Sequence, residues 1–233
     1  MKSNYLREAN RRVAIKPGKI AWILVIVLVT PLILYYLYTR GIKYLNFSRA
    51  VYTDYFWFRA PWLLVHVVLG ITATLIGPFQ FIPAIRNRHP QFHRNLGKVY
   101  IGCVVLSTFD SFYLNYTAQL GLVYSVGLAM LGVVWLGTTV MAYLSIRKGN
   151  VRMHREWMIK SYVITLSFVG FRAVEDTLEK ASIGSFIDRK VLMAWACWAV
   201  PFFVTEVVLQ ARRLYAKRPI QSFADDRSLS YKD

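Results

Sequence analysis

The stretches IRNRHPQFHR (residues 85–94) and IRKGNVRMHR (residues 146–155) decide the expected fold. Aligned without a gap, they share Ile-Arg at their starts and His-Arg at their ends. Each joins the end of one long apolar run to the start of the next. Their offset of 61 residues matches two membrane-spanning helices with their loops, since one span takes about 20 residues. The pair therefore indicates a tandem two-helix repeat, although six regularly spaced spans would give a similar layout.

The apolar runs themselves predict a helical membrane protein. The chain of 233 residues is 56% hydrophobic, and its formal charge is +17. Most charges lie between the apolar runs, which is typical of helices in lipid because a helix satisfies its own backbone there. The runs exceed about 18 residues and do not alternate, so they exclude a β-barrel. Because the basic residues flank these runs, we expect them to contact membrane lipids and not nucleic acid.

We therefore expect an all-α, polytopic transmembrane bundle. A basic N-terminal segment (1–19) precedes the transmembrane domain (20–211), and a polar tail (212–233) follows it. The six expected spans cover about residues 20–39, 61–85, 97–116, 121–146, 157–175 and 191–211.

The distribution of Lys and Arg predicts the topology. With a cytoplasmic N-terminus, 21 of the 29 Lys and Arg residues lie in cytoplasmic segments and 8 lie outside. Since positive charge accumulates on the cytoplasmic side, both termini are expected there. His93-Arg94 and His154-Arg155 then lie at the cytoplasmic boundary.

The repeat predicts how these histidines are related. Two parallel hairpins, spans two and three and spans four and five, are commonly related by an axis along the membrane normal. His93 and His154 then lie at the same depth and face each other across a four-helix core. Small or polar stripes on the helices indicate either close packing or a lined cavity. The stripe residues are Gly70, Ala73, Gly77, Gln80, Gly97, Tyr100, Val104, Ser107, Ser111, Met158, Ser161, Thr165, Phe168 and Arg172.

Ionisable residues inside the apolar runs are a second signal. His66 and Asp110 lie in the outer half of spans two and three, and Arg172 closes the outer end of span five. Burying a charge in lipid costs several kcal/mol unless it is paired. We therefore expect a buried pair between Asp110 and Arg172, with either a structural role or a role in a polar path.

Three segments resemble a known family. HVVLGITATLIGPFQF (66–81), HRNLGKVY (93–100) and HREWMIKSY (154–162) are similar to a bacterial family of predicted multi-pass membrane proteins, the domain-of-unknown-function family 2306. The resemblance covers roughly residues 60–180, and HRxWM followed by Ser-Tyr is its more specific part. It implies a helical domain in the bacterial inner membrane and no particular activity. The positions that match the pattern are His66, His93, Gly97, Tyr100, His154, Arg155, Trp157, Ser161 and Arg172.

The first functional hypothesis is a b-type haem or quinone-linked electron-transfer protein with a redox partner. Haem iron accepts imidazole ligands from facing helices, so His93 and His154 are the expected axial pair. Arg94 and Arg155 would meet the propionates. The arrangement resembles the four-helix core of the cytochrome b561 group. His66 is a further candidate, but it aligns with Gly127 in the repeat, so no second haem is expected.

Three alternatives stay open, and one of them is a structural membrane subunit without any site. His89 and His93 have the i, i+4 spacing of helical metal ligands, and His154 is the third candidate for a zinc site on the cytoplasmic face. Alternatively, the protein is a cofactor-free transporter or lipid-interacting protein, in which the inner His and Arg residues bind headgroups. No nucleotide loop or nucleophile motif indicates a soluble type of active site.

Overall fold

The computed structural model describes residues 30, 31, 33–118 and 120–216, and every regular element in them is a helix. The all-α prediction is therefore confirmed for this part of the chain. The predicted first span (20–39) lies mostly outside the described residues, as do the N-terminal segment (1–19) and most of the tail.

The chain divides into two compact units, Met1–Ile71 and Thr72–Asp233. The boundary falls inside α4 (Ala60–Gln80), so that helix belongs to both. Within the first unit, η1 (Leu37–Gly41), η2 (Ile42–Leu45) and α3 (Arg49–Trp57) precede α4. The fully buried Tyr52 anchors this segment: its hydroxyl donates to the carbonyl oxygen of Tyr44 at 2.5 Å.

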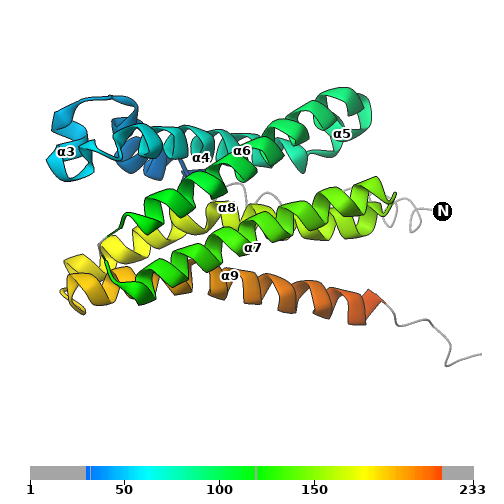
Figure 1. The fold of residues 1–233 in the computed structure, drawn as a ribbon. Coiled ribbons are helices and arrows are strands. Elements are labelled where there is room, and N and C mark those ends of the chain that lie inside the picture. The colour runs from blue at the N-terminus through cyan, green and yellow to red at the C-terminus, as the bar shows by residue number, and fades with distance from the viewer. Residues whose placement is uncertain (1–29, 32, 119, 217–233) are drawn as a thin grey trace, which may run out of the picture. The chain divides into compact units, whose positions relative to one another are not determined.

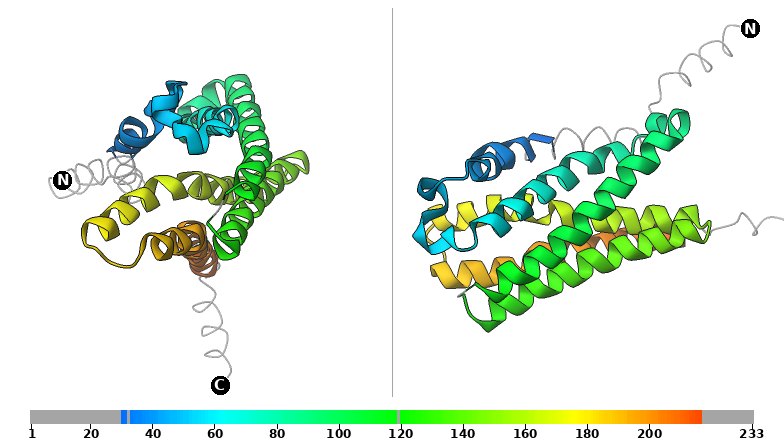
Figure 2. Two further views of the ribbon diagram at one scale, coloured as in Figure 1. Left: turned by 60° about the vertical axis from the view of Figure 1, so that its left-hand side comes forward. Right: turned by 45° about the horizontal axis from the view of Figure 1, so that its top comes forward.

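The second unit is a helical bundle (Figure 1). Helix α7 packs against α6, α8 and α9, and α8 also packs against α9. Short connections make successive helices antiparallel, so the starts of α6 and α8 lie at the same end as the ends of α7 and α9 (Figure 2). We call this the histidine end, because it contains His93 and His154. After α4, the helices of the second unit are α5 (Pro83–Arg88), α6 (Pro90–Tyr116), α7 (Leu122–Arg147), α8 (Val151–Lys180) and α9 (Phe186–Ala216).

Three of the described helices, α4, α7 and α9, are long and apolar enough to cross a membrane. Large apolar side chains on α7 and α9 are exposed, for example Val133 (52%) and Phe203 (67%), as expected for surfaces that face lipid. Helices α6 and α8 cover the predicted third and fifth spans but are more polar. The count of six spans and the orientation therefore remain predictions.

The second predicted span ends earlier than expected. Helix α4 stops at Gln80, whereas the prediction continued to residue 85. Ile82 is extended because the ring of Pro83 disfavours the helical conformation of the preceding residue. The short helix α5 then forms a separate element before α6.

Close packing holds the second-unit part of α4 (residues 72–80) against α8. The hydroxyl of Tyr162 donates to the carbonyl oxygen of Thr74 at 3.1 Å. A Cβ at Gly77 would overlap the Tyr162 ring, so only glycine permits this approach.

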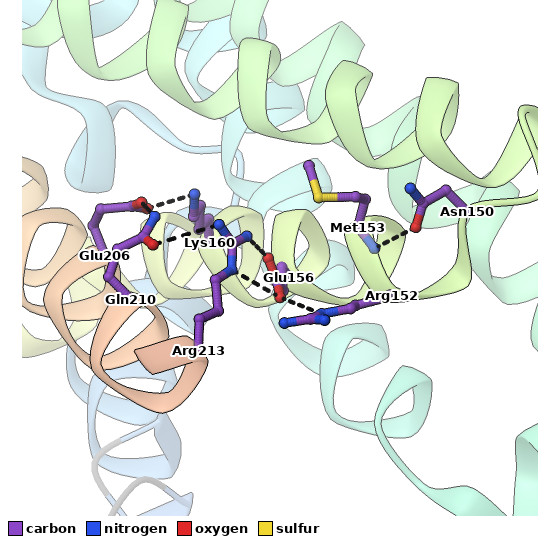
Figure 3. Close-up of polar contacts among 8 residues, drawn as sticks. All are labelled: Asn150, Arg152, Met153, Glu156, Lys160, Glu206, Gln210 and Arg213. Atoms are coloured by element: carbon purple, nitrogen blue, oxygen red, sulfur yellow. Dashed lines mark hydrogen bonds and ion pairs between the residues drawn. The ribbon is translucent and has the colours of Figure 1, made fainter. Parts of the chain in front are cut away.

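Ion pairs join α8 to α9 near the histidine end (Figure 3). Glu156 pairs with Arg213, and the buried Lys160 pairs with Glu206 at 2.5 Å. The Lys160 ammonium also lies 4.1 Å from the ring centre of Trp157. These contacts give the buried cation both a charge partner and an aromatic neighbour, which offsets part of its desolvation.

Candidate functional site

Both histidines of the predicted site lie in the first turn of a helix at the histidine end. Pro90 occupies the first turn of α6, where its missing N–H costs nothing, and His89 is the N-cap residue. Helix α8 is capped by Asn150, whose side chain accepts a hydrogen bond from the backbone N–H of Met153 at 3.0 Å. Local sequence therefore fixes where each helix begins and presents His93 and His154 in equivalent turns.

His154 is held by a specific hydrogen bond. Its Nδ1 atom lies 2.8 Å from the carbonyl oxygen of Ala142 on α7. Because a carbonyl only accepts, Nδ1 carries the proton and donates. This leaves Nε2 as the ring atom that can meet a ligand, as in metal-bound histidines whose other ring nitrogen donates to a carbonyl.

His93 is half-buried, and its Nδ1 atom is buried without a hydrogen-bond partner. Burial lowers the pKa of this imidazole below its ordinary value of 6.5, and the neighbouring charges of His154, Arg86 and Arg94 lower it further. The lowered pKa favours the neutral form of His93, which is the form that binds metals.

A buried hydroxyl network lies deeper in the bundle. The Tyr100 hydroxyl lies 2.9 Å from Ser161 Oγ and 2.8 Å from Thr165 Oγ1. Thr139 Oγ1 lies 2.7 Å from Ser161 Oγ, and the Trp135 indole N–H donates to Thr165 at 2.9 Å. Tyr100 and Ser161 are 61 residues apart, so two equivalent positions of the repeat are in contact. This contact supports a repeat in which α6 and α8 correspond.

The sequence stripes identified the α6 and α8 members of this network, Tyr100, Ser161 and Thr165. They did not identify the α7 members, Trp135 and Thr139. The available signal was a tryptophan and a pair of threonines in an otherwise apolar run.

Two further buried polar atoms lie near the histidines. Gln80 is 8% exposed and its Nε2 has no hydrogen-bond partner, while its Oε1 lies 3.4 Å from the Cβ position of Gly97. Gly97 is one turn beyond His93 on the same face of α6. The Nε1 atom of Trp157, one turn beyond His154, is also buried without a partner. The site thus contains two buried donors with no acceptor. The sequence predicts Gln80 only as part of a stripe that indicates either close packing or a lined cavity.

Three other residues were predicted for the site at the histidine end. Arg94, Arg155 and His89 are exposed. Among the residues that the structure describes, no group of three or more His, Cys, Asp and Glu side chains is arranged to hold a metal ion. The arrangement therefore gives no support to a zinc site of His89, His93 and His154.

The other predicted site residues are Asp110, Arg172 and His66. Asp110 is buried on α6, and Arg172 on α8 donates to Glu175 at 2.8 Å. The predicted pair between Asp110 and Arg172 stays a prediction. His66 lies in the first unit and is half-buried, and its expected part in cofactor binding also stays a prediction.

Comparison with known proteins identifies the family. The DUF2306 family, described as a predicted membrane protein, matches residues 63–209. No curated protein and no solved structure matches the chain. The family match covers more than half of the chain and includes both His93 and His154, which confirms the resemblance seen in the sequence. The chain therefore belongs to the DUF2306 family of predicted membrane proteins.

Proposed function

We propose that this membrane protein transfers electrons through a cofactor bound at the histidine end, between the starts of α6 and α8. The observation that carries the proposal is that the Nδ1 atoms of His93 and His154, which lie in equivalent helix turns, have different surroundings. His154 donates Nδ1–H to a backbone carbonyl, and His93 has a buried Nδ1 without a partner and a lowered pKa. Burial favours the neutral form of His93, and the bond to Ala142 leaves Nε2 of His154 as the ring atom that can meet a ligand.

A b-type haem is the first cofactor that we propose for this pair, because haem iron accepts imidazole ligands. His93 and His154 would hold its iron, and the bound haem would supply reversible one-electron chemistry. The hydrogen bond to Ala142 would fix the orientation of His154. Arg94 and Arg155 adjoin the ligands and are exposed, so they would meet the propionates from the solvent side.

A quinone is the second candidate, and the unpartnered donors favour it. Gln80 Nε2 and Trp157 Nε1 are buried N–H groups that lack an acceptor. Leaving a buried donor unsatisfied costs about 1–3 kcal/mol, so a ligand with carbonyl oxygens would be stabilised there. Such a ligand would carry electrons to or from a redox partner at the same membrane.

The proposed setting is the bacterial inner membrane, with six spans and both termini in the cytoplasm. The excess of Lys and Arg around the repeat copies supports this orientation. The histidine end would then face the cytoplasm. Labelling of a cysteine introduced at position 150 from the outside of intact cells would contradict the orientation.

An absorption spectrum of the detergent-purified protein, oxidised and then reduced with dithionite, tests the haem. We expect a Soret band that shifts on reduction. His93→Ala and His154→Ala should each abolish it almost as fully as the double change, because two axial ligands act as one unit. His89→Ala is the matched control, since His89 is exposed, and it should keep the band.

A colourless protein would overturn the haem proposal, and solvent extraction would then test the quinone. Co-purified quinone that is lost in Gln80→Leu and Trp157→Phe would support the second candidate. Stoichiometric zinc would instead indicate a metal site. A protein without haem, quinone or metal would overturn the redox proposal in favour of a transporter or lipid-interacting protein.

A further inference from the structure

The histidine end carries a cluster of exposed basic side chains, of which the proposed cofactor would use only two. The two connections at this end, with the helix starts that follow them, cover residues 83–98 and 146–155 (Figures 1 and 2). They contain eight Lys and Arg residues and no Asp or Glu. One of the eight, Arg152, pairs with Glu156. We call the other seven, all exposed, the basic surface: Arg86, Arg88, Arg94, Lys98, Arg147, Lys148 and Arg155.

The basic surface has no counter-charge within the described part of the chain. None of its seven side chains forms an ion pair with an acidic residue there. The acidic residues of α8 and α9 near this end are already engaged with other cations: Glu156 pairs with Arg213, and Glu206 pairs with Lys160 (Figure 3). The field of the basic surface is therefore directed at whatever lies outside the bundle, and it attracts an anionic partner.

The composition of the surface favours a protein as that partner. Helix α5 has no buried residue, so it presents Arg86 and Arg88 without adding a side chain to the core. The exposed Phe92 and Val151 lie among the cations, in the first turns of α6 and α8. Arginine and aromatic side chains are enriched where proteins bind one another. An anionic lipid headgroup needs the positive charge alone.

The location of the surface suits electron transfer. His93 and His154 lie in the first turns of α6 and α8, between the cations of the two connections. A soluble protein docked on the basic surface would therefore lie next to the proposed cofactor. Complexes of electron carriers bury small interfaces, and complementary charges guide their encounter.

We propose that the basic surface docks a soluble electron carrier with an acidic face. This inference rests on the proposed electron transfer at the histidine end and names the chemistry of its redox partner. Positive charge on the bundle and negative charge on the carrier bring the two redox centres together, and the exposed Phe92 and Val151 add apolar contact.

Binding of a purified acidic flavodoxin to the full chain tests the proposal, with the protein in phosphatidylcholine nanodiscs so that no anionic lipid competes. We expect binding at low salt that weakens about tenfold between roughly 50 and 300 mM NaCl, because salt screens exposed charges. The basic carrier cytochrome c should not bind. Flavodoxin binding that is absent, insensitive to salt or matched by cytochrome c would overturn the proposal.

A pair of charge reversals locates the docking site. Lys148→Glu changes an exposed lysine at the C-terminal end of α7, within the basic surface, and should weaken flavodoxin binding about fivefold. Lys180→Glu makes the same change at the C-terminal end of α8, at the opposite end of the second unit, and should bind like the wild type. Equal binding by the two variants would contradict the assignment.

Anionic lipid is the competing occupant, and the same variants test it. If the basic surface serves lipid headgroups, phosphatidylglycerol nanodiscs should raise the unfolding temperature above its value in phosphatidylcholine, and Lys148→Glu should lose that difference. Loss of the lipid effect in Lys148→Glu with unchanged flavodoxin binding would show that the proposal is wrong.

The binding assay and the absorption spectrum can fail separately. A protein with a Soret band that does not bind flavodoxin would refute the partner and leave the proposed electron transfer standing. A protein that binds flavodoxin but contains neither haem nor quinone would refute the electron transfer and, with it, the redox role of the docked protein.

Discussion

The two copies of the repeat have the same ends but different backbones between them. In the second copy, α7 continues to Arg147, Gly149 turns the chain with a φ of 72°, and Asn150 caps α8. In the first copy, α4 stops at Gln80 and the short helix α5 intervenes before α6. The second copy is thus a tight helical hairpin, and the first is a longer turn organised by Pro83 and Pro90.

This difference changes the surroundings of the two histidines. His154 donates to the carbonyl of Ala142, which lies inside α7. The position 61 residues earlier is Phe81, which lies just beyond the end of α4. His93 has no hydrogen-bond partner on Nδ1. One imidazole is therefore oriented by a hydrogen bond to the backbone, whereas Nδ1 of the other has no such bond.

Helix α9 forms ion pairs with only one copy. Glu156 and Lys160 pair with residues of α9. The equivalent residues in the first copy are Asn95 and Val99, and both are exposed. The start of α8 is therefore fixed to its neighbour by charge, and the start of α6 is not.

Breaking the charge contact of the second copy should have the largest effect. Lys160 is 6% exposed, and Glu206→Gln leaves its ammonium without its counter-charge. We expect a loss of about 2–3 kcal/mol in the free energy of unfolding, below the ~3–5 kcal/mol of a fully buried pair because Glu206 is partly exposed. Denaturant titration in detergent measures it.

The matched change in the first copy is Asn95→Ala, which should cost less than about 0.5 kcal/mol. The double change Lys160→Met with Glu206→Leu should recover most of the stability, because no unpaired charge remains. If Glu206→Gln and Asn95→Ala have equal effects, the contrast between the copies is wrong.

The contact between the copies should have the next largest effect. Tyr100→Phe removes the hydroxyl that joins Ser161 and Thr165. Each of these partners keeps another bond, to Thr139 and Trp135, so the expected cost is about 1–2 kcal/mol in unfolding free energy.

Ser161→Ala combined with Tyr100→Phe should cost less than the sum of the two single changes, because the residues share one network. Tyr116→Phe is the control, since Tyr116 is 89% exposed, and it should have no measurable effect. Strict additivity would show that the equivalent positions do not interact energetically.

Much of this arrangement was predictable from sequence. Apolar runs predicted the helices, and the offset of 61 residues, with the polar stripes, brought Tyr100 and Ser161 to equivalent positions. The early end of α4 was missed because the apolar run continues through Phe81 and Ile82, and the backbone effect of Pro83 outweighs that continuity.

The energetic asymmetry of the site was not predictable from sequence. Whether an imidazole has a partner depends on which carbonyl the fold brings near it, and His93 and His154 look alike in the aligned repeat. Likewise, Glu156 and Arg213 are 57 residues apart, and only the packing of α9 on α8 brings them together.

The caps of the two helices give a smaller and separate test. Asn150→Ala removes the hydrogen bond to the Met153 N–H and should cost about 1 kcal/mol in unfolding free energy. His89→Ala should cost less than about 0.5 kcal/mol, because the His89 side chain makes no capping hydrogen bond. Denaturant titration of both variants measures the difference, and an equal loss would contradict it.

The smallest expected effect is a pH dependence that comes from His93 in the first copy. In the protein without a bound cofactor, the pKa of folded His93 lies below 6.5. Above pH 6.5 the imidazole is neutral in both the folded and the unfolded chain, so it adds no pH dependence. As the pH falls below 6.5, the unfolded chain binds the proton first, and stability declines until the pH passes the folded pKa.

His93→Asn should therefore flatten part of the decline in unfolding temperature between about pH 6.5 and 5. A bound haem should flatten it as well, because a ligating imidazole cannot be protonated. Unfolding temperatures across this range, with and without the substitution, measure the effect. If the wild type and His93→Asn decline in parallel, burial does not hold His93 neutral, and the two copies present equivalent imidazoles after all.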